Sequence, residues 1–368
     1  MHSFKARLTA GFIFLSALLS GCSLIAPQTY ALKEKRPPDL PARVELTEVP
    51  FYPQDDYYCG PSSLAMAVTA AGVKVTPEDL VDQVYLPGRK GSLQVEMLAA
   101  ARRRGLIAYE LAPKVEDLLR ELAAGTPAIV LENYGPFKWF PVWHYSVVVG
   151  YDLNRLEVIR RSGKRPRLPT PLPVFEKIWR EEDYWALLVL PPERVPVSAT
   201  ETRYAAAVVA LEQSGHLKNA FIAYNALLKR WPTSLAGQMG RGNAAYALRD
   251  LDTAEAAFRQ ATQDHPDAAP AFNNLANVLA ERNKLNDALA AAEKAVALGG
   301  PMLATTEATL EEIKQKIAAA HAEEALRAEQ NPPVTPAVLV PAPAEIQPAA
   351  PVAMPKAKAK KKKAAPPA

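Results

Sequence analysis

Cys59 is one of two cysteines in a chain of 368 residues, and it stands in the stretch YPQDDYYCGPSSLAM, from Tyr52 to Met66. Gly60 and Pro61 follow it, and the apolar run after them predicts a helix, because proline is tolerated in the first turn of a helix. Unpaired N–H groups and the dipole at a helix N-terminus favour an anion, so this position can lower the pKa of a thiol. A structural cysteine gains nothing from it, and the location therefore favours a nucleophile.

His144 is the candidate general base that a thiolate nucleophile requires. Of the five histidines, it alone falls outside both the N-terminal signal and the repeat region described below. A lone histidine is more often structural, but its combination with a cysteine at a helix end favours catalysis. Gln54, five residues before Cys59, could donate its side-chain N–H to a developing oxyanion, together with the backbone N–H of Cys59. The alternative for Gln54 is a place on a surface loop.

Two residues, Asp152 and Ser162, are candidates for the group that would orient His144. Asp152 lies eight residues further along the same predicted strand, about 26 Å away if the strand is straight. A hairpin folded at residues 153–155 instead brings residues 160–164 opposite the histidine, and of these Ser162 has an acceptor side chain. We therefore rank Ser162 or a backbone carbonyl first and expect Asp152 to close the hairpin turn. A weakly oriented histidine would lower the rate.

The elements that must position these residues form two regions with different periodicities. From residue 48 to Pro196 helical stretches come first and strand-like runs follow, which is typical of an α+β domain. The expected helices are Pro61–Ala71, Pro77–Val84, Ser92–Arg104 and Val115–Ala124. The expected strands are the runs TPAIVLEN, HYSVVVGYD, RLEVIRRS and YWALLVLPP, rich in β-branched and aromatic residues. Residues 22–47 are expected to be a tether in front of this domain.

A repeat of 34 residues replaces the strands beyond Ala199. Its units align at Leu217–Pro232, Leu251–Pro266 and Leu285–Gly300. A small residue recurs at Ala220, Ala254 and Ala288, and the position four residues later holds Tyr224, Phe258 and Ala292. This pattern resembles the tetratricopeptide repeat, which implies a solenoid of paired helices over residues 199–329 with Leu303–Glu329 as a capping helix. Such a solenoid usually binds a protein partner on its concave surface, and stacking without a partner is the alternative.

The first 21 residues have the basic start and apolar run of a secretory signal, and they end in LSGC at Cys22. This ending resembles the bacterial lipobox, which implies lipidation of Cys22, and Ser23 resembles the second residue of lipoproteins sent to the outer membrane. We expect a lipoprotein of the bacterial cell envelope, anchored in the outer membrane and facing the periplasm. The alternative is a plain signal peptide cleaved nearby. With Cys22 acylated, Cys59 is left unpaired in a compartment that favours disulfides.

The net charge of +4 is not spread evenly along the chain. The signal carries +2 and residues 331–368 carry +5, which leaves −3 for residues 22–330. No nucleic-acid partner is therefore expected. The segment 330–368 is rich in proline, alanine and lysine and is expected to be disordered, with lysines that are either solvated or in contact with anionic lipid or polymer. No cysteine–histidine cluster or phosphate loop predicts a metal or a cofactor.

The stretches PQDDYYCGPSSLAMAV and HYSVVVGYD resemble the papain-like double-glycine leader peptidases, especially their free-standing relatives fused to tetratricopeptide repeats. The resemblance covers residues 48–192 and implies a papain-like fold. It also implies that Cys59 attacks, His144 is the base and Gln54 builds the oxyanion hole. The chain departs from that family in a shorter glutamine–cysteine spacing, in the missing Asp-Pro that orients the histidine, and in the missing transporter and ATPase. Leader removal during export is therefore not expected.

Three functional readings follow. The first is an envelope lipoprotein with cysteine peptidase activity that acts on a protein or peptide, while the repeats recruit a protein partner. The second is a non-catalytic binding or assembly lipoprotein, in which the papain-like domain is a peptide clamp. The third keeps the thiol chemistry for amide transfer or for cleavage of a cell-wall crosslink. Trp139, Phe140 and Trp143 either form apolar substrate subsites or pack their own loop.

Overall fold

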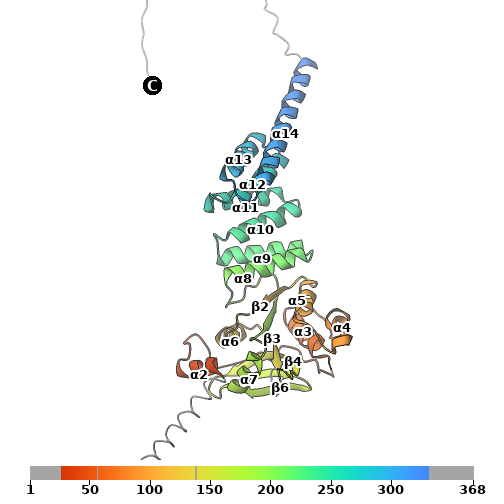
Figure 1. The fold of residues 1–368 in the computed structure, drawn as a ribbon, viewed down its shortest axis with the longest axis vertical. Coiled ribbons are helices and arrows are strands. Elements are labelled where there is room, and N and C mark those ends of the chain that lie inside the picture. Colours follow the sequence, from red (N-terminus) through yellow and green to blue (C-terminus); the bar gives the residue numbers. More distant parts are fainter. Residues whose placement is uncertain (1–25, 56, 137–138, 331–368) are drawn as a thin grey trace, which may run out of the picture. The chain divides into compact units, whose positions relative to one another are not determined.

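A computed structural model describes residues 26–55, 57–136 and 139–330 (Figure 1). The predicted signal 1–21, Cys22 and the predicted disordered tail from Asn331 onward lie outside these residues. The chain divides into two units, Met1–Ile317 and Ala318–Ala368. The described part of the second unit, residues 318–330, is the end of helix α14 (Leu303–Gln330), and its described side chains are exposed.

An antiparallel sheet of seven strands forms the centre of the N-terminal domain. Its order is β2-β7-β3-β4-β5-β6, and β1 pairs with the end of β4. The strands are β1 (Arg43–Glu45), β2 (Ile107–Glu110), β3 (Ala128–Asn133), β4 (Trp143–Asp152), β5 (Glu157–Ser162), β6 (Arg165–Pro171) and β7 (Ala186–Leu190). The four strands expected from the sequence are β3, β4, β5 and β7. Helices pack on a sheet whose strands are all antiparallel, so the predicted α+β class is confirmed.

Helices cover both faces of this sheet, and each face has its own apolar core. One face is covered by α3 (Cys59–Ala70), α4 (Glu78–Val84) and α5 (Gln94–Arg102), beside the short 3-10 turn η1 (Pro87–Arg89) (Figure 1). The other face is covered by α2 (Pro27–Glu34), α6 (Val115–Ala123) and α7 (Leu172–Arg180). Four of these helices were expected from the sequence, with ends that differ by one or two residues.

The described part of the expected tether, residues 26–47, is folded onto the domain. Leu32 of α2 and Leu40 are buried in the core beneath α6 and α7. The buried carboxylate of Glu176 accepts hydrogen bonds of 2.9 and 2.7 Å from two backbone N–H groups in the first turn of α2. This carboxylate satisfies donors that would otherwise lack a partner at the helix start. The described residues of the expected tether therefore pack against the domain, because their apolar side chains complete its core.

Paired helices make up the C-terminal region of the described chain. They are α8 (Glu201–Gln213), α9 (Leu217–Arg230), α10 (Leu235–Ala247), α11 (Leu251–Asp264), α12 (Ala269–Glu281), α13 (Leu285–Leu298) and α14 (Leu303–Gln330). The three aligned repeat units are α9, α11 and α13. Tyr224 and Phe258 are almost fully buried, and each ring fills the space beside a glycine of α10, Gly240 and Gly242 respectively. A β-carbon on either glycine would lie within 2.4 Å of a ring atom, which explains the glycine and aromatic positions of the repeat.

The first repeat helices share a core with the sheet. Tyr204 and Val208 of α8 belong to the same buried cluster as Ile107 and Tyr109 of β2. The predicted boundary at residues 196–199 therefore separates two kinds of secondary structure without separating two cores.

Candidate active site

The nucleophile candidate Cys59 is the first residue of α3, as the sequence suggested. Gly60, the next residue, allows the start of this helix to approach the segment before α5. A β-carbon at Gly60 would lie 2.1 Å from Ser92 Oγ and 2.5 Å from Ser92 Cβ. Only glycine permits this contact. The Gly-Pro pair after the cysteine therefore fixes where the helix begins and what forms the wall beside the thiol.

The backbone of Tyr145, the residue after His144, ties strand β4 to the start of α3. Its carbonyl accepts hydrogen bonds from Gln54 Nε2 at 3.1 Å and from Ser63 Oγ at 3.3 Å. Its N–H lies toward the sulfur of Cys59 and stabilises the thiolate form. These contacts hold the strand that carries the histidine against the helix that carries the cysteine.

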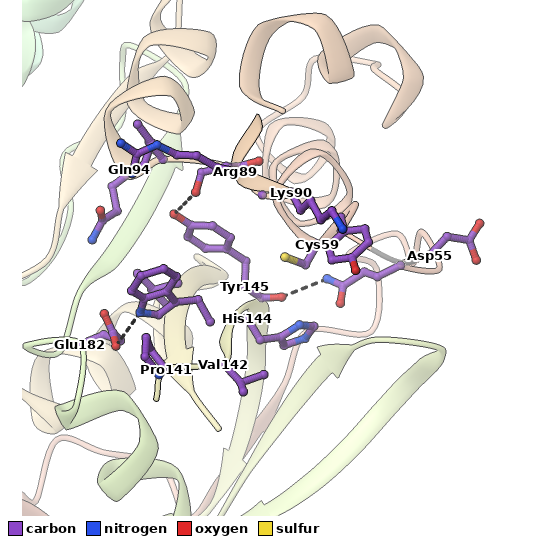
Figure 2. A pocket seen from close by; sticks show the side chains of 17 residues that line it. Asp55, Cys59, Arg89, Lys90, Gln94, Pro141, Val142, His144, Tyr145 and Glu182 are labelled. Atoms are coloured by element: carbon purple, nitrogen blue, oxygen red, sulfur yellow. Dashed lines mark hydrogen bonds between the residues drawn. The ribbon is translucent and has the colours of Figure 1, made fainter. Parts of the chain in front are cut away.

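Cys59 and His144 open onto one pocket with a volume of about 570 Å³ (Figure 2). The two residues come from opposite sides of the pocket's inner end, one from α3 and the other from β4. Among the described residues the thiol and the imidazole make no hydrogen bond to each other. Catalytic hydrogen bonds are often long before substrate binds, so the shared pocket is the relevant observation.

Burial favours the neutral forms of both side chains. Desolvation raises the pKa of the Cys59 thiol, and the backbone N–H groups of Tyr145, Gly60 and Cys59 offset part of this rise. Desolvation, followed by the positive charge of Arg160, lowers the pKa of His144 from 6.5 to about 4. The expectation that the helix end gives the thiol a lowered pKa is therefore wrong for this state, because burial outweighs the N–H groups. The resting pair is a thiol and a neutral imidazole.

Gln54 is buried beside the cysteine, but its amide is already engaged. Nε2 donates to Ser63 Oγ at 3.0 Å as well as to the Tyr145 carbonyl, and Oε1 accepts from the backbone N–H of Gly163 at 2.6 Å. A carboxamide has two N–H donors, so both are used. The alternative of a glutamine on a surface loop is wrong, since Gln54 is only 6% exposed. Its role as an oxyanion donor remains a prediction and requires one of these bonds to be exchanged.

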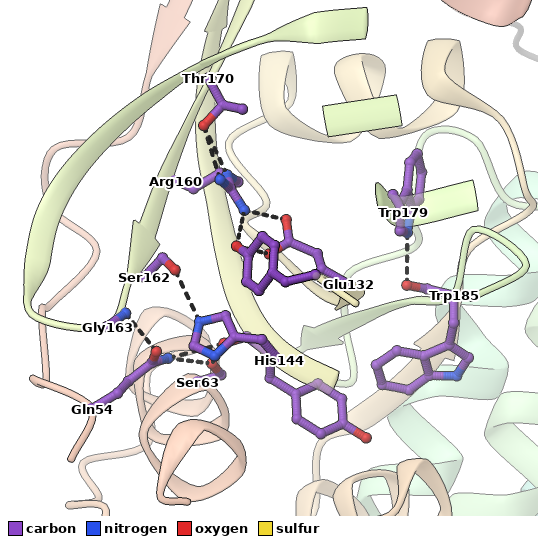
Figure 3. A network of polar contacts seen from close by, with 12 residues as sticks. Gln54, Ser63, Glu132, His144, Arg160, Ser162, Gly163, Thr170, Trp179 and Trp185 are labelled. Carbon is purple, nitrogen blue, oxygen red and sulfur yellow. Dashed lines mark hydrogen bonds and ion pairs between the residues drawn. The ribbon is translucent and has the colours of Figure 1, made fainter. Parts of the chain in front are cut away.

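Ser162 lies next to the histidine, and Asp152 lies at the hairpin turn. Ser162 Oγ is 2.9 Å from His144 Nε2 (Figure 3). The Asp152 carboxylate accepts hydrogen bonds from the backbone N–H groups of Asn154 and Arg155, which close the turn between β4 and β5. The geometry thus matches the ranking from the sequence, while the orienting role of Ser162 remains a prediction.

The aromatic residues of the loop between β3 and β4 lie in different surroundings. Trp143 lines the pocket, is 62% exposed and donates its indole N–H to Glu182 Oε1 at 2.9 Å. Trp139 lines a separate hollow beside α7, and Phe140 is 67% exposed. Of the three aromatic residues considered as substrate subsites, Trp143 is the one that lines this pocket.

Sequence reasoning missed a buried charged network behind the histidine. Glu132 of β3 and Arg160 of β5 form an ion pair in which both side chains are almost fully buried (Figure 3). Tyr134 Oη donates to Glu132 Oε2 at 2.8 Å and accepts from Arg160 Nη1 at 2.9 Å. The sequence signal was available: a glutamate inside the otherwise apolar run AIVLEN and an arginine inside EVIRRS need partners if both strands are buried.

Within the described ranges, no group of histidine, cysteine and carboxylate side chains could hold a metal ion. In the same residues no helix is both long enough and apolar enough to cross a bilayer.

Comparisons with known proteins agree with this architecture. Residues 46–181 match the Peptidase_C39 like family. No curated protein matches the chain. Among solved structures, a candidate C39-like peptidase from Bacillus anthracis aligns with 21% identity and a TM-score of 0.34, covering 40% of this chain and 97% of that one.

The helical region aligns with tetratricopeptide-repeat structures. The TPR2B domain of yeast Sti1, solved as a complex with pHsp70, has 18% identity and a TM-score of 0.30 and covers 32% of this chain and 97% of its own. The translocator chaperone SycD of Yersinia enterocolitica has 19% identity and a TM-score of 0.30, with coverages of 32% and 85%. The N-terminal domain is thus similar to C39-like peptidases and the C-terminal helices are similar to tetratricopeptide repeats.

Proposed function

We propose that the N-terminal domain is a cysteine peptidase that hydrolyses a peptide bond through Cys59 and His144. The observation that carries this proposal is the placement of a helix-start cysteine and a neutral imidazole on one pocket. A neutral imidazole can accept the thiol proton, which an imidazolium cannot. The match of residues 46–181 to the Peptidase_C39 like family supports the same activity.

The chemistry would proceed in two balanced halves. His144 takes the thiol proton as sulfur attacks the peptide carbonyl, and the C–N bond then breaks as the imidazolium gives that proton to the leaving amine. Water attacks the resulting thioester, His144 again takes the proton and returns it to sulfur, and the carboxylic acid leaves. Ser162 contacts Nε2, so Nδ1 is the ring nitrogen left for the thiol. The backbone N–H of Cys59 and a released N–H of Gln54 would stabilise the oxyanion.

The test is hydrolysis of a peptide library by the purified protein, read by mass spectrometry. We expect the wild-type chain to cleave at defined sites and the Cys59→Ala variant to cleave none. Cys22→Ala is the matched control, because it removes the other cysteine and should leave cleavage unchanged. Equal cleavage by the Cys59→Ala variant would refute the assignment.

A non-catalytic clamp is the second candidate function. The observation that favours it is the absence, among the described residues, of a carboxylate hydrogen-bonded to His144, together with an engaged Gln54 amide. In that case Cys59→Ala would bind peptide and support cellular function as the wild type does. Changes to the repeats would then abolish function while changes to the pocket would not.

For the peptidase function, we propose that the repeats bind the protein partner in a pocket between their helices. A pocket of about 500 Å³ lies between α10, α12 and α14, and its lining includes the carboxamides of Asn243, Asn274 and Asn277. Asn274 Nδ2 donates to Asn243 Oδ1 at 2.9 Å. Side-chain amides can pair with the backbone of an extended peptide. Asn277→Ala should weaken capture of the partner and leave peptide cleavage unchanged.

We further propose that the protein is a lipoprotein of the bacterial envelope, anchored through Cys22 in the outer membrane and facing the periplasm. Three residues separate Cys22 from Ala26, which is fully buried in the domain. The four steps from Cys22 to Ala26 span at most about 14 Å, so the domain would lie close to the bilayer. Metabolic labelling with a fatty acid should mark the wild type and fail to mark Cys22→Ser; equal labelling would exclude this anchor.

A further inference from the structure

The register of the sheet places a buried carboxylate directly across from the histidine. Glu132 of β3 pairs with His144 of β4, and Glu132 is completely buried. Residues directly opposed in an antiparallel pair point to the same face of the sheet with β-carbons about 5 Å apart. A carboxylate at such a position could orient the imidazole by accepting a hydrogen bond from it. The carboxylate of Glu132 instead pairs with Arg160 and Tyr134.

The hydroxyl of Tyr134 is hydrogen-bonded to this ion pair, and its ring packs against the imidazole, although the residue is 42% exposed. Its hydroxyl donates to Glu132 and accepts from Arg160, so its one hydrogen is used and its oxygen is also engaged. Its ring centroid lies 5.5 Å from that of His144, with an angle of 37° between the planes. Distances of 4.5 to 7 Å are typical of aromatic pairs that attract each other. The phenol ring therefore covers the imidazole, while Ser162 contacts its Nε2.

All three guanidinium nitrogens of Arg160 have hydrogen-bond partners, which favours one arrangement of the network. One guanidinium nitrogen binds Glu132 and the Tyr134 hydroxyl, and the other two contact Thr170 Oγ1 at 3.2 and 2.9 Å. A buried ion pair rarely adds net stability but fixes one geometry when its hydrogen bonds are complete. The network thus connects residues of β3, β5 and β6, and β4, the strand that carries His144, lies between β3 and β5 in the sheet.

We propose that Glu132, Arg160 and Tyr134 are positioning residues for His144, and that the Tyr134 ring fixes the plane of the imidazole in place of an acidic hydrogen-bond partner. This inference rests on the proposed peptidase function. It explains how the imidazole can stay oriented although no carboxylate among the described residues is hydrogen-bonded to it.

The charges around His144 are consistent with this role. From β5, Arg160 disfavours the imidazolium and lowers the pKa of His144. From β3, Glu132 forms the ion pair with Arg160. The exposed Asp55 in front of α3 pairs with Lys164 of the turn after β5 at 3.6 Å, so these two largely cancel. The remaining titratable group on the facing helix is Cys59, a neutral thiol at rest.

The test measures the pKa of His144 by NMR on protein labelled at histidine, alongside kcat and KM for a peptide substrate. His144→Gln identifies the resonance among the five histidines. In Tyr134→Ala we expect the pKa of His144 to rise by about one unit or more as water reaches the ring. We also expect kcat to fall about tenfold or more, with KM little changed, since an oriented base contributes at least that much. Tyr134→Phe keeps the ring but loses its hydrogen bonds. Its His144 pKa and its kcat should lie between those of the wild type and those of Tyr134→Ala.

Tyr184→Ala is the matched control. Tyr184 also donates its hydroxyl to a glutamate, Glu176, at 3.2 Å in the same domain, so its loss should lower stability without moving either readout. A folded Tyr134→Ala variant with the wild-type pKa at His144 would overturn the positioning role. If the wild type cleaves no peptide, the proposed function fails, and the NMR titration still decides whether Tyr134 controls the imidazole.

Discussion

Acidification should destabilise this protein through His144, and the sign follows from its environment. The pKa of His144 is lowered in the folded protein from 6.5 to about 4. Between these two pH values the unfolded chain therefore binds a proton that the folded protein does not. The contribution of the neutral His144 ring to the free energy of unfolding is fully present above pH 6.5. It falls as the pH decreases toward 4, because protons favour the unfolded state between these values.

The size of the effect follows from the same pKa difference. One pKa unit corresponds to about 1.4 kcal/mol, so full burial of the neutral ring would cost about 3 kcal/mol of unfolding free energy by pH 4. His144 is half-buried at the edge of the pocket, and water screens part of the effect. We expect roughly 2 kcal/mol to be lost between pH 7 and pH 4.5.

The assay is urea denaturation of the wild type and of His144→Gln at pH 7, 5.5 and 4.5. Other groups titrate in this range in both proteins, so only the difference between the two curves reports on His144. The wild type should lose stability faster than the variant as the pH falls. Parallel curves would show that the pKa of His144 is the same in the folded and the unfolded chain, and the lowering of this pKa by burial would then be wrong.

Two further predictions concern the Cys59 thiol and the contact between Gly60 and Ser92 beside it. Because burial raises the pKa of Cys59, alkylation of a Cys22→Ser protein by iodoacetamide should accelerate up to an apparent pKa above about 8.5; a rate that stays flat down to pH 5 would instead indicate a preformed ion pair. Gly60→Ala should cost about 1 to 3 kcal/mol of unfolding free energy and most of the cleavage activity, because its β-carbon overlaps Ser92. Gly88→Ala, in the nearby turn η1 and with open space around it, should change neither.

The sequence was sufficient for the parts of the fold that carry a local signal. Apolar periodicity predicted α3 and α6, and runs of β-branched residues predicted β3 and β4. The 34-residue spacing predicted the helices α9, α11 and α13 in register. Strand β6 was not predicted, since its sequence, RPRLPTP, holds three prolines and lies at the sheet edge where proline is tolerated.

The candidate site could be predicted only where one chain segment determines it. Cys59 at a helix start follows from the residues next to it, and Ser162 follows from counting along one hairpin. The engaged amide of Gln54 and the ring contact of Tyr134 depend on segments about 90 and 10 residues away, so nothing local predicts them. The raised pKa of the thiol also depends on burial by distant segments, which is why reasoning from the helix end alone gave the opposite sign.

The most direct test of peptidase chemistry is to label the nucleophile covalently. A peptide acyloxymethyl ketone derived from a cleaved sequence should alkylate the protein once, with loss of its carboxylate, and tandem mass spectrometry should locate the thioether on Cys59. The rate of addition should fall sharply in His144→Gln, which keeps the sulfur but removes the base. Addition at an unchanged rate in that variant, or an adduct at any other residue, would contradict the pairing of this cysteine with this histidine.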